Sequence, residues 1–81
     1  MLQSAQIRAA RALLGWKQDD LAKAAKIGIA TIRRIEGQDG PVMGYVSTLI
    51  SIQSAFETAG IRFLDNDVGG GIGVRLIKPK A

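Results

Sequence analysis

Apolar residues recur at helical spacing along the first sixty residues of this chain, and an alternating apolar pattern follows them. The first pattern predicts helices over residues 5–14, 18–25, 29–37 and 46–59. Gly15, Gly37 and Gly60 stand where three of these helices end, and Ser4 stands where the first begins. The residues expected on the inner helix faces are Ile7, Ala10, Leu14, Leu21, Ala22, Ala25, Ile32, Ile35, Val46, Leu49, Ile52, Phe56 and Ala59.

The last twenty residues have the character of a β-hairpin. Two short apolar segments, residues 61–64 and 72–77, flank a loop rich in Asp and Gly. An isolated two-stranded hairpin is only marginally stable in water, so this one must pack on the helices or pair with another copy. The expected fold class is therefore mainly α: four helices within residues 1–60, followed by a C-terminal β-hairpin within residues 61–81.

Length and composition exclude most enzyme chemistry. The chain has 81 residues, room for one small core, and it contains neither Cys nor His. We expect no enzyme activity, no cofactor, no metal and no evident small-molecule site. No apolar run approaches the roughly 20 residues of a membrane span, and the first residues lack the pattern of a signal peptide. We therefore expect a cytoplasmic protein without a membrane partner.

Two segments near the C-terminus resemble ligand-binding motifs, but neither has the full pattern of its motif. Gly69–Gly73 lies before a strand instead of before the helix that a dinucleotide-binding fingerprint requires, and it lacks the last glycine of that fingerprint. Asp65-x-Asp67 starts like a calcium loop but lacks flanking helices and the glutamate at the twelfth position.

The charge balance points to a polyanionic partner. Eleven Lys and Arg oppose seven Asp and Glu, for a net charge of +4. Residues 1–44 contain seven of the bases and four of the acids, which gives +3 in this half. An excess of positive charge favours nucleic acid or an anionic membrane.

The segment Gln18-Asp19-Asp20-Leu21-Ala22 … Ile27-Gly28 … Thr31-Ile32-Arg33-Arg34-Ile35-Glu36-Gly37 resembles the XRE (Cro/CI-type, phage-repressor-like) family of helix-turn-helix DNA-binding domains. The resemblance covers residues 4–60, with the helix-turn-helix at 18–37, and leaves the hairpin outside. It implies a four-helix repressor-like fold and double-stranded DNA as the partner. Lys26 and Gly28 depart from the family, which usually has Gly in the turn and Ser or Thr at the helix cap.

The resemblance also implies residue roles. The helix at 29–37 would enter the major groove, where Arg34 matches a base-reading position and arginine pairs with guanine. Expected base contacts are Ile29, Ala30, Thr31, Arg33 and Arg34, and expected phosphate contacts are Lys17, Gln18, Gly28 and Gln38. Arg11 and Glu36 match a pair that ties the first helix to the third.

The hairpin suggests how two copies meet. Ile61 and Phe63 share one side of the first strand, and Val74 and Leu76 share one side of the second. This apolar face exceeds what one small domain is expected to cover, so these four residues are predicted to form a dimer interface. The resulting hypothesis is a homodimeric transcriptional regulator that binds an inverted-repeat operator and represses by promoter occlusion. The alternative is an antitoxin-like or anti-activator module whose main partner is another protein.

Overall fold

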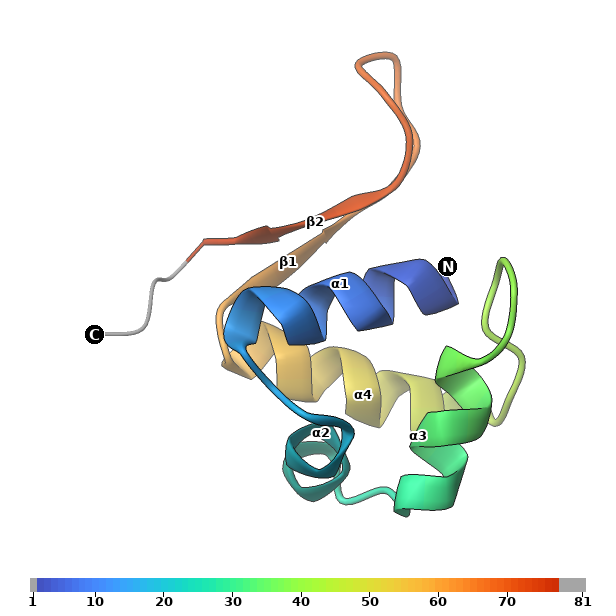
Figure 1. Cartoon of the computed structure of the whole chain (residues 1–81). Coiled ribbons are helices and arrows are strands. Elements are labelled where there is room, and N and C mark those ends of the chain that lie inside the picture. Colours follow the sequence, from blue (N-terminus) through green and yellow to red (C-terminus); the bar gives the residue numbers. More distant parts are fainter. Residues whose placement is uncertain (1, 78–81) are drawn as a thin grey trace.

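Four helices followed by a two-stranded antiparallel hairpin make up this protein, as predicted (Figure 1). The computed structural model describes residues 2–77, so the last four residues of the predicted hairpin region lie outside the described part. The elements are α1 (Ser4–Leu14), α2 (Gln18–Ala25), α3 (Ile29–Glu36), α4 (Val46–Thr58), β1 (Ile61–Leu64) and β2 (Gly73–Leu76). Within the described range, none of these helices is long and apolar enough to cross a membrane.

The ends of α1 and α2 follow from backbone conformation. Gly15 ends α1 with φ 69° and Lys26 ends α2 with φ 58°, both in the left-handed region. Glycine adopts this conformation freely, whereas lysine does so at a cost. The start of α1 differs from the prediction, because Gln3 is the capping residue. Ser4 already lies inside the helix, and its hydroxyl is used in a tertiary contact.

The hydrophobic core lies between the four helices and the base of the hairpin. Its fully buried members include Ile7, Leu21, Ile52 and Phe56. Trp16 is half-buried and stacks on Phe56, with ring centroids 5.6 Å apart. Aromatic stacking of this kind adds to the burial of apolar area, so the link between α1 and α2 is anchored to α4.

One inner-face prediction is wrong. Val46 was expected in the core with Ile52, but its side chain is 71% exposed. At 3.6 residues per turn, Val46 lies about a third of a turn away from Ile52 around the helix. It lies instead one turn before Ile50, which is also exposed. The first half of α4 is therefore apolar on a face that the described part of the chain leaves uncovered.

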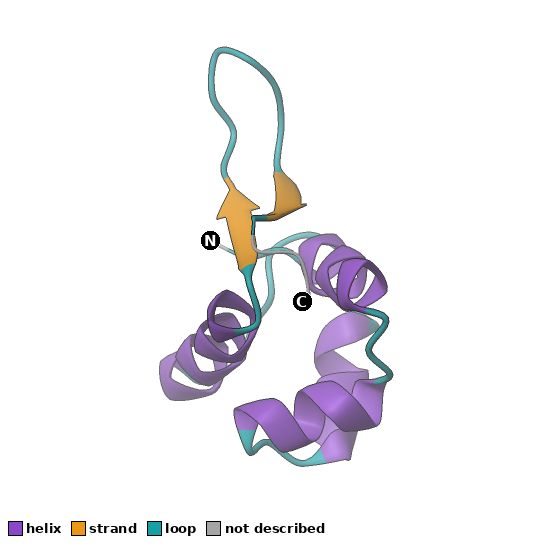
Figure 2. Cartoon of the chain, turned by 90° about the vertical axis from the view of Figure 1, so that its left-hand side faces the viewer, coloured by secondary structure: helices purple, strands orange, loops and turns teal. Residues whose placement is uncertain are grey.

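The hairpin packs on α1 and α4, and its loop extends away from the helices (Figures 1 and 2). The strands pair from Ile61 with Leu76 to Leu64 with Gly73. Ile61 is only 2% exposed and belongs to the core, and Phe63 packs edge-on against Phe56. The expectation that this apolar face exceeds what one domain covers is therefore wrong for Ile61, whereas Phe63, Val74 and Leu76 pack against the core and stay partly exposed.

Gln6 connects the loop end of the paired strands to α1. This residue is 3% exposed, and its Nε2 donates to the carbonyl oxygens of Leu64 and Gly73 at 3.1 Å each. Its Oε1 accepts from the backbone N–H of Gln3 at 2.9 Å. A buried side-chain amide must satisfy its donors and acceptor within the protein. Gln6 does so by joining the point where the two strands separate to the start of α1.

Candidate nucleic-acid interface

The turn between α2 and α3 orients two short helices in the manner of a helix-turn-helix. Lys26 reverses the chain through its left-handed conformation, and the backbone N–H of Ile27 donates to the carbonyl of Ala22 at 3.0 Å. Gly28 caps α3 in an extended conformation. The buried face of α3 consists of Ile32, Ile35 and Glu36, so its opposite face is directed to solvent.

Three exposed residues share that outer face. Ala30, Arg33 and Arg34 are spaced three and four residues apart, which places them side by side on one face of the helix. Within residues 2–77, neither guanidinium has an ion-pair or hydrogen-bond partner. Both arginines are therefore free to bind an external acceptor.

The other predicted base contacts lie beside this face. Ile29 and Thr31 are half-buried, so each presents only part of its side chain to solvent. Gly28 is exposed, and a Cβ added there would meet nothing within 4 Å. The start of α3 is therefore open to close approach by a ligand backbone.

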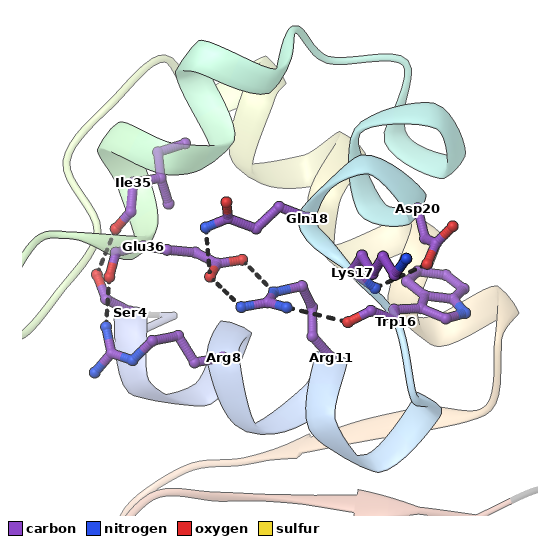
Figure 3. A network of polar contacts seen from close by, with 9 residues as sticks. All are labelled: Ser4, Arg8, Arg11, Trp16, Lys17, Gln18, Asp20, Ile35 and Glu36. Atoms are coloured by element: carbon purple, nitrogen blue, oxygen red, sulfur yellow. Dashed lines mark hydrogen bonds and ion pairs between the residues drawn. The ribbon is translucent and has the colours of Figure 1, made fainter.

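An ion pair between α1 and α3 lies behind the outer face (Figure 3). Arg11 Nε is 2.6 Å from Glu36 Oε2, and Arg11 Nη2 donates to Glu36 Oε1 at 2.7 Å. Arg11 Nη1 also donates to the carbonyl of Trp16 at 3.0 Å. This bidentate geometry is the strong form of a charge-assisted hydrogen bond. The structure thus brings together the two residues that the family resemblance paired.

Further contacts hold the C-terminal end of α3 against α1. The Ser4 hydroxyl donates to the carbonyl of Ile35 at 2.7 Å, and Arg8 donates to the carbonyl of Glu36 (Figure 3). The last carbonyls of a helix lack partners within the helix, and here side chains of α1 provide them. Sequence reasoning missed both roles, because neither contact has a local sequence signature. Together with the ion pair, they fix the orientation of α3.

The predicted phosphate contacts have different surroundings. Gln18 Nε2 donates to Glu36 Oε1 at 3.2 Å, which joins the start of α2 to the same network. Lys17 is exposed, and its backbone N–H donates to the Asp20 carboxylate at 2.8 Å, so Asp20 caps α2 where Lys17 cannot. Gln38 is occupied at both ends of its amide by the backbone of Met43.

This geometry defines a class of protein: a helix-turn-helix domain whose second short helix has a basic outer face. Comparison with protein families gives the family. Residues 7–36 match the family model described as "Helix-turn-helix", and the match extends from α1 to the end of α3. These residues belong to the XRE-type helix-turn-helix family, and the protein is of the DNA-binding transcription-regulator kind. A comparison with curated proteins found no match to the chain.

Proposed function

We propose that this protein binds double-stranded DNA in a sequence-specific manner, as a homodimer on an inverted-repeat operator, and represses transcription by occupying the promoter. The observation that carries the proposal is the outer face of α3, where Arg33 and Arg34 are exposed on a firmly held helix and have no partner among residues 2–77. Arginine recognises guanine through a bidentate contact with O6 and N7, which the major groove presents.

The orientation of α3 supports specific recognition. A base contact requires the side chain to reach its acceptor with little freedom, so the helix must be held by the rest of the domain. Ser4, Arg8 and Arg11 supply this support by fixing the C-terminal end of α3. Arg33 and Arg34 are then exposed side chains on a fixed element.

The start of α2 supports a phosphate contact. A helix N-terminus presents unpaired backbone N–H groups that favour an anion. The side-chain amide of Gln18 has two N–H donors, and one of them serves Glu36. The second is available to a phosphate oxygen. Glu36 thereby positions Gln18 as well as Arg11.

The proposal is tested by selecting bound duplexes from a random DNA library at about physiological salt. We expect enrichment of an inverted repeat with half-site centres about 34 Å apart, one helical turn. Enrichment of no sequence above background would refute specific recognition. Transcription from a promoter that overlaps the selected site, with and without the protein, then tests repression.

Matched variants test the contact that we propose for each residue. Arg34→Ala is expected to lose about 1–3 kcal/mol on the selected site and to relax base preference. Gln18→Ala is expected to weaken binding to all duplexes equally. Arg62→Ala removes the same charge from an exposed position of the hairpin and serves as the control. If Arg34→Ala and Arg62→Ala lower affinity equally on every sequence, Arg34 acts only through its charge.

A further inference from the structure

The segment from the end of the α3–α4 loop into α4 displays a group of exposed apolar side chains. Seven large hydrophobic residues are exposed in the described part of the chain, and four of them lie within residues 43–50. These four, which we call the α4 face, are Met43 (70% exposed), Tyr45 (83%), Val46 (71%) and Ile50 (59%). A helix that is apolar on both its buried and its exposed side indicates an interface with another molecule.

The α4 face lies in the longest uncharged part of the sequence. Between Asp39 and Glu57 there is no charged residue. No residue of this segment offers a cation to a phosphate backbone, so DNA is a poor occupant of this face. Two copies of a chain with net charge +4 repel each other, and they approach at least cost through a face without charge.

The loop before α4 is held in place from both sides. The backbone N–H of Val42 donates to the carbonyl of Leu2 at 2.9 Å, and Val42 itself is buried. The side chain of Gln38 binds both the N–H and the carbonyl of Met43. These contacts present Met43 outward on an ordered backbone. A preordered surface loses less conformational entropy on association than a flexible one.

The position of this face relative to α3 suits a dimer that reads two half-sites. The α4 face follows α3 directly along the chain, through the loop at residues 37–45. The hairpin instead lies on the opposite side of α1 from α2 and α3 (Figure 1). An interface through the hairpin therefore joins two copies on the side away from α3, whereas an interface at the α4 face joins them next to its C-terminal end.

We propose that the α4 face is where a second copy of this chain binds, and that Tyr45, Val46 and Ile50 of the two copies meet across a two-fold axis. This inference deepens the proposed homodimer and rests on it. It places the contact in the first half of α4 instead of on Ile61, Phe63, Val74 and Leu76, which pack within one chain.

Sedimentation velocity over a concentration series of the full chain tests this interface. Ile50→Lys places a charge in the α4 face and is expected to raise the dimer dissociation constant at least tenfold. Val68→Lys makes the same kind of change at a fully exposed apolar position of the hairpin loop and is expected to change it less than twofold. Circular dichroism establishes that both variants are folded. A wild-type chain that stays monomeric, or an Ile50→Lys variant that dimerises like wild type, overturns the inference.

Single cysteines locate the contact independently, because the chain has no cysteine of its own. In a two-fold interface a residue near the axis faces its own copy. We expect rapid disulfide cross-linking of Ile50→Cys and little cross-linking of Arg62→Cys, which is exposed on β1. The reverse pattern would assign the dimer to the hairpin and overturn the inference.

DNA binding by the same variants separates the two proposals. If Ile50→Lys is monomeric and still binds a single half-site duplex, the interface and DNA recognition both stand. If the wild type dimerises through the α4 face but selects no DNA sequence, the proposed function fails while the interface stands. If the wild type is monomeric and selects a single half-site, the interface fails while DNA recognition stands. A stable complex with a different protein through the α4 face, without self-association, also overturns the inference.

Discussion

Replacing Glu36 by Gln should destabilise the protein strongly, because the Glu36 carboxylate neutralises the partly buried guanidinium of Arg11. The Glu36 side chain is 3% exposed and that of Arg11 is 21% exposed. Three donors are directed at the carboxylate: Nε and Nη2 of Arg11 and Nε2 of Gln18. In the Gln variant one oxygen remains to accept, and the new amide group donates toward groups that are themselves donors.

The size of the expected loss in stability follows from the burial of the Arg11–Glu36 ion pair. Removing one partner of a buried ion pair costs about 3–5 kcal/mol, and the partial exposure of Arg11 favours the lower end, about 3 kcal/mol. A domain of this size has a total stability of about 4–12 kcal/mol. A loss of about 3 kcal/mol therefore lowers Tm by about 12–24 °C.

Urea unfolding followed by fluorescence is a direct assay, because Trp16 is the only tryptophan and stacks on Phe56 in the core. The midpoint should fall while the m-value stays unchanged, since the surface exposed on unfolding is the same. Glu57→Gln is the control, because that carboxylate is exposed and contacts only an exposed amide in the described structure. Its effect should stay within about 0.5 kcal/mol.

A loss below about 1 kcal/mol for Glu36→Gln would refute the reasoning. A double-mutant cycle gives a second criterion. Replacing Arg11 and Glu36 together by Met removes both charges, so the double variant should be more stable than the sum of the single effects predicts. Strict additivity would mean that the two side chains are not coupled.

Three further changes test the supports of the fold. Lys26→Gly should raise the free energy of unfolding by about 0.5–1 kcal/mol, because Lys26 has φ 58° and glycine adopts this conformation without strain. Lys23→Gly should lower it by about 1 kcal/mol, because glycine inside α2 is a poor helix former. Thermal melts of both variants test this, and a lower Tm for Lys26→Gly would contradict it. Ser4→Ala should cost about 0.5–1.5 kcal/mol in urea unfolding, since the carbonyl of Ile35 loses the Ser4 hydroxyl and keeps only the longer bond from the Gln38 N–H at 3.3 Å; an unchanged midpoint would contradict this role. Gln6→Ala should speed amide exchange in β1 and β2 more than in α2, and equal acceleration everywhere would mean that Gln6 does not hold the hairpin specifically.

Much of the fold was predictable because its signals are local. Apolar spacing located all four helices and both strands, and Gly15 marked a helix end through its left-handed backbone. The helix-turn-helix was found through residues that lie close together in the sequence, and the family comparison agrees with that interpretation. Residue type and spacing suffice for such features, since their interactions join residues a few positions apart.

The site itself was predictable only in part. The exposed face with Arg33 and Arg34 follows from helical spacing once Ile32 and Ile35 are taken as core. The contact from Ser4 to Ile35 spans 31 residues, and no spacing rule predicts it. The sequence predicts a phosphate contact for Gln18 but not the contact of its amide with Glu36, 18 residues away.

The sequence by itself determined the helices, the turn and the class of protein, because these depend on local backbone preference and on periodic burial. Only the tertiary structure decided that Ile61 is core, that Val46 is exposed and that Gln6 holds the hairpin. The physical reason is that burial depends on which elements meet in space. The periodic pattern shows that a helix has an apolar side, but packing decides how far along the helix its neighbours extend. On α4 they leave Val46 and Ile50 exposed, and this apolar face is what we propose a second copy covers.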